Sequence, residues 1–372
     1  GGDDFITLRS TVEGSGSDNV QQTGVKSIEG AGEHPIDFWI DFKGTIAENS
    51  TPRCAIVRVR YHNYTCEHDI YVRQGYAPIT IDGNAESDKN PAWASYNVYR
   101  FDANNAPVYT KSPLEEGSLF RRGNRTAILA SNNDRPGFTF GLGPSGSFDV
   151  LELGATTPSQ KTWSQLAPSA DDVKSRFASW SIAGDHERIA TIEDFYTLES
   201  TSIHSNIGKA YGVLYGDGAT ETQKSVEVAL GYDHNEDPTN SKKGMRGCFV
   251  FNINNSHNIF FPIGKSGYGR RKGMTSNGEK VGALRYAQRT DYYNNDGTGN
   301  IQYVPLFYDL FERPGAIYQC RNRLSSTGSD VRKSSAFDIN YFTMGFEGFE
   351  NGASNNSDGS DSDACFIRTV KY

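Results

Sequence analysis

The stretch between Asp185 and Ser200, with the sequence DHERIATIEDFYTLES, constrains the fold more than any other part of the chain. Thr191 stands three residues before Asp194, which is the spacing of a capping box. In that motif the hydroxyl accepts from a first-turn amide and the carboxylate reaches back to the start of the helix. The sequence therefore predicts a helix that begins after Thr191, entered through a short turn at Arg188-Ile189-Ala190.

The predicted helix carries an apolar stripe, so it should pack against the rest of the protein. Ile192, Phe195 and Tyr196 recur at the i, i+3, i+4 spacing of one helix face. A second short helix is predicted just before it, over Ser169 to Trp180, because Ser169 and Asp172 repeat the capping signal. Nearly all of the remaining sequence has the pattern of strands and loops, so these two helices are expected to brace a β-rich domain.

The composition supports a mostly β fold. There are 39 glycines, and 21 phenylalanines and 20 tyrosines stand against only three methionines, which is typical of tight turns joined to aromatic-rich strands. The net charge is −8, from 37 basic and 45 acidic residues that are interspersed, so nucleic acid and anionic membrane surfaces are disfavoured as partners. The expected class is α+β, mostly β, of the kind found in extracellular proteins.

The chain shows no sign of its own membrane segment or export signal. No run approaches the roughly 18 apolar residues of a transmembrane helix, and the first residues, GGDDFITLRS, lack an apolar signal region. We therefore expect any signal or anchor to lie upstream of residue 1 or to have been removed. No transmembrane segment is expected within these residues.

Residues 1–85 are expected to form a small β-sandwich. Apolar and polar residues alternate from Ile36 to Lys43, which predicts a half-buried strand. Two further strands, 55–61 and 70–74, are separated by a turn over His62 to Asp69, which predicts an antiparallel hairpin. The polar stretch 82–91, DGNAESDKNP, is the best linker in the chain.

Residues 92–372 are expected to form a second, larger domain. Within it, Gly247 to Phe251 has the pattern of a fully buried strand. In the run from Ala364 to Val370, the residues Phe366, Arg368 and Val370 alternate with Ile367 and Thr369. This pattern predicts a final strand that forms part of a sheet.

Several motifs of the second domain resemble a known family. They are the sequence RIATIEDF, the sequence Phe-Phe-Pro-Ile-Gly at 260–264 followed by Gly267-Tyr268-Gly269-Arg270-Arg271, and the closing Ala-Cys-Phe-Ile-Arg at 364–368. In this order they resemble the major paralogous domain, which is similar to the formylglycine-generating-enzyme and C-type-lectin-like folds. Ala190 stands where that family prefers proline. Residues 61–78, YHNYTCEHDIYVRQGYAP, resemble the β-sandwich repeats of Bacteroides-type fimbrillin-like surface proteins.

The resemblance implies a non-enzymatic adhesion protein, exported to the cell surface and associated with the outer membrane. A fimbrial tip subunit is one such protein. Its partners would be a host or bacterial glycan, a protein ligand on another surface, or other fimbrial subunits. The alternatives are a surface glycan-binding protein that captures polysaccharide and a secreted hydrolase or oxidase.

Candidate ligand-binding residues combine aromatic faces with polar neighbours, as sugar recognition favours. They are Tyr292, Tyr293, Asp296, Arg270 and Arg271. A C-type lectin holds sugar through calcium with clustered oxygen ligands, and the weak calcium candidates of this composition are Asp291, Asn295 and Asp296. These residues do not fit the spacing of a calcium-binding loop, and solvated turns are the better explanation of their composition. We expect no obligatory cofactor, with calcium as the alternative.

The five cysteines and seven histidines do not form a recognisable catalytic set. There is no C-x-x-C pair. The thiol chemistry of an oxidase needs two neighbouring cysteines, and the cysteine nearest to Cys365 in the sequence, Cys320, lies 45 residues before it. Cys66 and His68 offer one sulfur and one imidazole, which favours a plain loop over a metal site. We therefore expect no catalytic residues.

Overall fold

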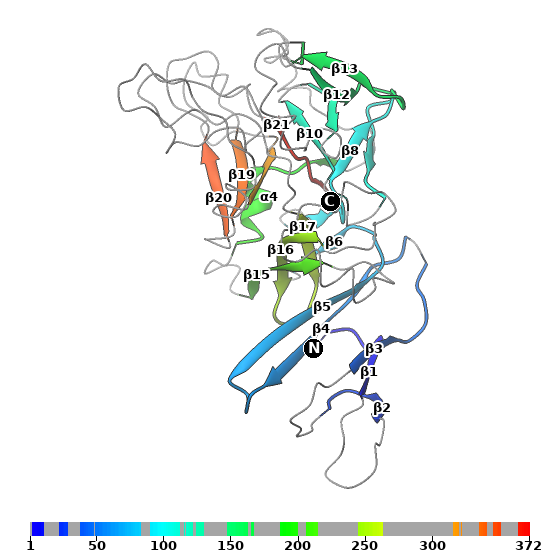
Figure 1. Cartoon of the computed structure of the whole chain (residues 1–372), viewed down its shortest axis with the longest axis vertical. Helices are drawn as coiled ribbons and strands as arrows, with labels where there is room; N and C mark the ends of the chain where they lie inside the picture. Colours follow the sequence, from blue (N-terminus) through cyan, green and yellow to red (C-terminus); the bar gives the residue numbers. More distant parts are fainter. Residues whose placement is uncertain are drawn as a thin grey trace, which may run out of the picture.

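A computed structural model describes a little under half of the chain. The described residues are 2–10, 22–28, 38–47, 49–82, 90–111, 115, 117–121, 124–129, 147–162, 165–166, 187–199, 206–214, 245–262, 315–319, 321, 335–340, 345–350 and 364–372. Most regular structure in these ranges is antiparallel β-strand, arranged in several small sheets (Figure 1). The expectation of a mostly β fold is confirmed at this level.

The first three strands form one small antiparallel sheet. They are β1 (Ile6–Ser10), β2 (Gln22–Val25) and β3 (Phe38–Phe42), in the order β2-β1-β3. In the register of β1 and β3, Leu8 lies opposite Ile40. The alternating pattern that predicted a strand at 36–43 is confirmed by β3.

The hairpin of β4 (Arg53–Tyr61) and β5 (Cys66–Gln74) is the longest paired element described near the N-terminus. Its ladder runs from Arg53 opposite Gln74 to Tyr61 opposite Cys66. The expected hairpin is confirmed, but the turn occupies only 62–65, because residues 66–69 continue the strand. Cys66 and His68 therefore lie on a strand and not in a loop.

The base of this hairpin is packed on both faces. One face contributes Ala55, Val57 and Val72 to an N-terminal core with Phe5 and Ile6 of the first sheet. On the other face, Tyr71 stacks on Phe249 with ring centroids 5.0 Å apart, and Cys54 belongs to the main core defined below. The hairpin thus joins residues on both sides of the predicted linker. The division of the chain at that linker stays a prediction.

The remaining strands form small sheets, and in the two larger ones strands from distant parts of the chain lie side by side. The five-stranded sheet has the order β13 (Ser159–Thr162), β12 (Ser147–Leu151), β11 (Ala127–Leu129), β10 (Ser118–Arg121), β21 (Ala364–Cys365). The four-stranded sheet has the order β14 (Glu187–Ile189), β22 (Thr369–Lys371), β7 (Ala92–Trp93), β6 (Ile79–Thr80). Two three-stranded sheets comprise β15 (Ile207–Leu214), β16 (Met245–Asn252) and β17 (Asn258–Pro262), and β18 (Gly315–Gln319), β19 (Ser335–Asn340) and β20 (Gly345–Glu350). A hairpin pairs β8 (Val98–Phe101) with β9 (Pro107–Tyr109).

The end of the chain is incorporated into two of these sheets, as its pattern predicted. β21 pairs with β10, and β22 lies between β14 and β7. Between the two strands, the carbonyl of Ile367 accepts from the amide of Val98 at 3.0 Å, and that of Arg368 accepts from Ala190 at 3.0 Å. The expected single strand is therefore two short ones. Both faces of this segment are covered, because residues 366–370 are all buried.

The predicted helix begins where the capping box placed it. α4 (Ile192–Tyr196) follows Thr191, whose hydroxyl accepts from the amide of Asp194 at 3.2 Å, while the Asp194 carboxylate accepts from the amide of Thr191 at 2.7 Å. Phe195 is buried against Trp93, with centroids 4.9 Å apart. The prediction of a turn at 188–190 was wrong in part, since Glu187–Ile189 is strand β14. The second predicted helix, 169–180, lies outside the described residues.

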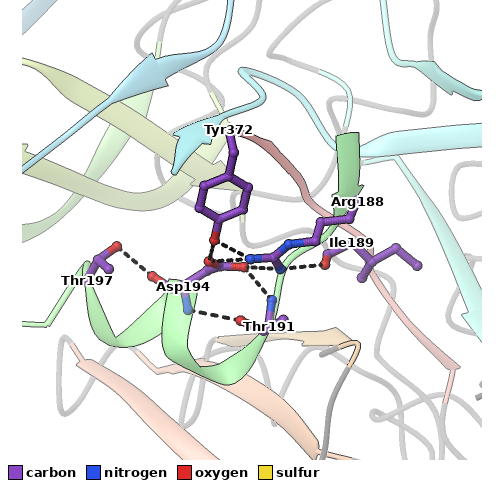
Figure 2. Close-up of polar contacts among 6 residues, drawn as sticks. All are labelled: Arg188, Ile189, Thr191, Asp194, Thr197 and Tyr372. Carbon is purple, nitrogen blue, oxygen red and sulfur yellow. Dashed lines mark hydrogen bonds and ion pairs between the residues drawn. The ribbon is translucent and has the colours of Figure 1, made fainter. Parts of the chain in front are cut away.

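The same carboxylate joins the helix to the end of the chain (Figure 2). Arg188 donates to both oxygens of Asp194, at 2.5 and 3.0 Å, and the hydroxyl of Tyr372 also donates to it. The Arg188 guanidinium lies 4.5 Å from the centroid of the Tyr372 ring. Charge-assisted bonds of this kind are stronger than neutral ones, so Asp194 connects β14, α4 and the residues after β22.

The main core is aromatic and surrounds a buried arginine. Its largest members are Trp93, Phe148, Phe195, Phe261, Tyr318 and Phe366. Arg368 is 0% exposed and donates to the side-chain oxygen of Asn97 at 2.8 Å and to the carbonyls of Ala94 and Phe260 at 2.9 and 3.0 Å. Its guanidinium lies 4.6 Å from the centroid of the Phe261 ring. Burial lowers the pKa of Arg368, so each of these contacts offsets a desolvation cost.

Replacing Arg368 with methionine should destabilise the protein by about 3–5 kcal/mol, because three buried acceptors lose their donors. Arg368→Lys should be nearly as damaging, since an ammonium cannot reproduce the planar fork. Urea unfolding followed by tryptophan fluorescence measures both. Arg58→Met is the control, because Arg58 is a partly exposed surface residue, and it should change stability by about 0.5 kcal/mol or less. Equal effects of Arg368→Met and Arg58→Met would contradict this role for the buried arginine.

Candidate binding surface

The residues proposed from sequence for ligand and calcium binding cannot be placed. Arg270, Arg271, Asp291, Tyr292, Tyr293, Asn295 and Asp296 all lie in 263–314, outside the described residues. Their assignment stays a prediction. The described part of the chain offers a different candidate, which is the outer end of the β4–β5 hairpin.

This hairpin tip comprises Tyr61 to Cys66 together with His68. Burial falls along the hairpin from the packed base, where Val57 is 8% exposed, to the tip, where Tyr61 is 40% and Tyr64 is 70% exposed. The tip extends away from the other labelled sheets (Figure 1). Tyrosine is amphipathic and has few rotatable bonds, so an exposed tyrosine at a projecting turn is well suited to making contacts with a partner.

The turn holds its residues in a left-handed backbone conformation. Asn63 and Tyr64 have φ values of 53° and 65°, and His62 before them has 51°. The amide of Thr65 donates to the carbonyl of His62 at 3.2 Å, and its hydroxyl donates to the same carbonyl at 2.6 Å. Glycine adopts positive φ most readily, and asparagine does so more often than other side chains. Asn63 fits this preference, but tyrosine in place of glycine costs about 1–2 kcal/mol.

The two faces of the outer hairpin differ in chemistry. On one face the ring of Tyr61 stacks on His68, with centroids 5.7 Å apart and planes 12° apart. On the other face, Arg58 pairs with Asp69 at 2.9 Å and Arg60 with Glu67 at 2.8 Å. The hydrogen bond from Arg58 to Asp69 raises the pKa of the guanidinium. The ion pairs leave little net charge on their face, so the aromatic face and the turn are the parts available for contact.

The tip also carries a half-exposed thiol. The sulfur of Cys66 lies 4.0 Å from the hydroxyl oxygen of Thr65. Cys54 and Cys248 are buried, and burial raises the pKa of the Cys54 thiol and raises that of Cys248 to about 12. No group of three or more His, Cys, Asp and Glu side chains suited to a metal ion occurs among the residues that the structure describes.

The arrangement can bind through aromatic stacking and hydrogen bonds. The ring of Tyr61 lies beside those of His62 and His68, and Asn63 follows in the same turn. The sequence signal was present in YHNY, where two tyrosines flank an asparagine between two strands. It was missed because the whole stretch from His62 to Asp69 was interpreted as a plain turn.

Comparisons with known proteins identify no relative of this chain. No family model matches the sequence, and neither a curated protein nor a solved structure matches it. Among the described residues, no helix has the length and apolar character needed to cross a membrane. The functional interpretation therefore rests on the geometry of the chain itself.

Tyr64→Gly should raise the free energy of unfolding by about 0.5–1 kcal/mol, because glycine adopts positive φ without the steric cost that tyrosine bears. Little burial is lost, since the Tyr64 side chain is mostly exposed. Tyr64→Ala is the matched control: it removes the same ring but keeps the strained Cβ, so it should bring no gain. Urea unfolding of the three proteins tests this, and an equal gain for alanine would show that backbone strain is not the cause.

Cys66 should react with iodoacetamide at pH 8 at least tenfold faster than Cys54 or Cys248, because the reagent must reach a thiolate and both other thiols are buried with raised pKa values. Timed labelling followed by peptide mass spectrometry measures the three rates. Labelling in urea, where all three sites should react at similar rates, is the control. Fast native labelling of Cys248 would contradict the packing described.

Proposed function

We propose that this protein is a non-enzymatic adhesion protein, exported to the cell surface, and that the hairpin tip makes first contact with its ligand. The single observation that carries the proposal is Tyr64, which is 70% exposed and held at φ 65° where glycine would be less strained. Backbone strain concentrates at functional sites, because selection retains it there in spite of its cost. We infer that the strain at Tyr64 is retained because it places an aromatic ring at the exposed end of the hairpin.

The packing of the hairpin base supports the same proposal. A contact surface binds better when it is rigid before the ligand arrives, because less conformational entropy is lost on binding. Residues from Arg53 to Val57 and from Ile70 to Gln74 lie between the N-terminal core and β16, while the tip lies beyond them. The tip is therefore an exposed end on a fixed support.

The proposed ligand is a glycan or a protein on another surface. Exposed tyrosine and histidine rings beside amide groups suit either, since such side chains combine apolar area with hydrogen bonding. The finer architecture belongs to the same proposal: an N-terminal β-sandwich followed by a lectin-like domain, with a fimbrial subunit as the form of adhesin implied by the resemblance. Arg270, Arg271, Tyr292, Tyr293 and Asp296 would belong to a second contact region.

Binding to a glycan array and to immobilised surface proteins, each with and without a calcium chelator, tests this function. Glycan binding that survives chelation supports a tip that binds through its rings. Glycan binding lost on chelation would place the site on the calcium candidates Asp291, Asn295 and Asp296 instead. Binding to proteins alone favours a protein ligand. Release of a hydrolysed or oxidised product would refute the non-enzymatic role.

Tyr64→Gly and Tyr64→Ala should each weaken binding to the selected ligand at least tenfold, because both remove the most exposed ring of the tip. The two variants are expected to differ in stability, so a shared loss of binding cannot result from unfolding. Tyr76→Ala is the matched control, since Tyr76 is 61% exposed and lies outside the tip. Surface plasmon resonance measures the three dissociation constants. Unchanged affinity in both Tyr64 variants would exclude the tip as the contact.

A further inference from the structure

Within the part of the chain that the structure describes, nothing pairs with the backbone groups on the outer edge of β3. β3 pairs with β1 on one side, and the described residues provide no strand on its other side. The amide of Lys43 donates to the carbonyl of Phe5 at 2.6 Å, so the backbone of Lys43 points toward β1. Because these directions alternate along an antiparallel strand, the amides and carbonyls of Phe38, Ile40 and Phe42 point outward. An edge of this kind is a template for another strand.

The side chains along this edge are unusually apolar for an exposed strand. Phe38 is 37%, Trp39 is 38% and Phe42 is 51% exposed. Natural edge strands more often carry lysine, proline or a bulge that discourages pairing. The described β3 has none of these, and its pairing with β1 is regular over all five residues. These features favour a partner strand over contact with water.

We propose that β3 pairs antiparallel with β3 of a second copy of this chain, across a twofold axis at Ile40. In this register Phe38 of one copy lies opposite Phe42 of the other, and Ile40 lies opposite its own counterpart. The three outward residues of each copy all fall in hydrogen-bonded pairs, so the ladder is complete on both strands. A twofold contact needs a surface that complements itself, and this five-residue strand does so.

The two faces of the joined sheet are also compatible. On one face, Phe38, Ile40 and Phe42 would continue the apolar surface that Ile40 already forms with the N-terminal core. On the other face, Trp39 lies opposite Asp41 of the second copy. Arg9 lies 4.3 Å from the Trp39 ring centroid and donates to Asp41 at 3.2 Å. Within each copy the positive charge of Arg9 therefore compensates the negative charge of Asp41, and no unpaired like charges meet across the contact.

The length of the strand sets the expected strength. Five residues bury a small area, which is typical of weak or transient association. We therefore expect a monomer–dimer equilibrium in the micromolar range or weaker, visible as concentration dependence in sedimentation velocity. Phe42→Lys, which places a charge on the edge, should weaken the dimer at least tenfold.

Engineered disulfides test the register directly. In a Cys66→Ser background, Phe38→Cys and Phe42→Cys chains should cross-link when mixed at equal concentration under mild oxidation. The paired positions have Cα atoms about 5.5 Å apart, within the range of a disulfide. Neither variant should cross-link alone at a comparable rate, because like positions lie about 13 Å apart along the strands. Both substitutions replace exposed side chains, so both proteins should fold, which circular dichroism checks.

A covalent dimer that forms at least five times faster in the mixture than in either variant alone supports the proposal. Ile40→Cys should also cross-link by itself, since Ile40 lies on the axis. Equal rates in all samples would indicate unspecific collisions and would refute the register. A wild-type chain that stays monomeric at millimolar concentration, with no cross-link in the mixture, would overturn the dimer.

Discussion

Three distant segments meet at Arg368: one supplies the guanidinium and the other two supply its acceptors. The oxygens come from the 94–97 segment and from the end of β17, while the arginine comes from the last residues of the chain. The acceptors are neutral, so the charge is stabilised by carbonyl and amide dipoles and by the face of Phe261. Moving any one of these segments would leave a buried charge short of a partner, which is why they hold one arrangement.

A second arginine repeats this principle at the base of the hairpin. Arg73 donates to the carbonyls of Ala77 and Asn258 at 2.9 and 3.1 Å and to the hydroxyl of Ser95 at 2.6 Å. These acceptors lie on both sides of the predicted linker. Burial lowers the pKa of Arg73, so the contacts again offset desolvation. Arg73 therefore fixes the base of the hairpin against residues on both sides of the linker, while Arg368 holds the neighbouring 94–97 segment and the end of β17 together.

Local signals in the sequence predicted the elements that local interactions determine. The capping box of Thr191 and Asp194 closes within four residues and the β4–β5 hairpin forms between neighbours, so both elements were predicted, although the predicted hairpin turn was four residues too long. β14 was missed because three residues carry too little pattern, and its partner β22 lies far along the chain. Arg368 was taken for a residue of an alternating face, because alternation cannot show that both faces of a strand are covered. The tip was missed because turn composition says nothing about strain.

The exposed features of the chain are separable from its stability. The ring of Tyr64 is mostly exposed, and the edge side chains of β3 are only partly covered, although Ile40 and Phe42 contact the N-terminal core. Their supports, Val57 and Phe5, are buried. Because Phe38, Phe42 and Tyr64 are all exposed, we expect changes of these side chains to leave the fold intact. Both features are locally unfavourable, one by backbone conformation and one by exposure of apolar area. The buried core already determines one fold, so the protein can tolerate both unfavourable features. We expect their cost to be offset only when a partner covers them.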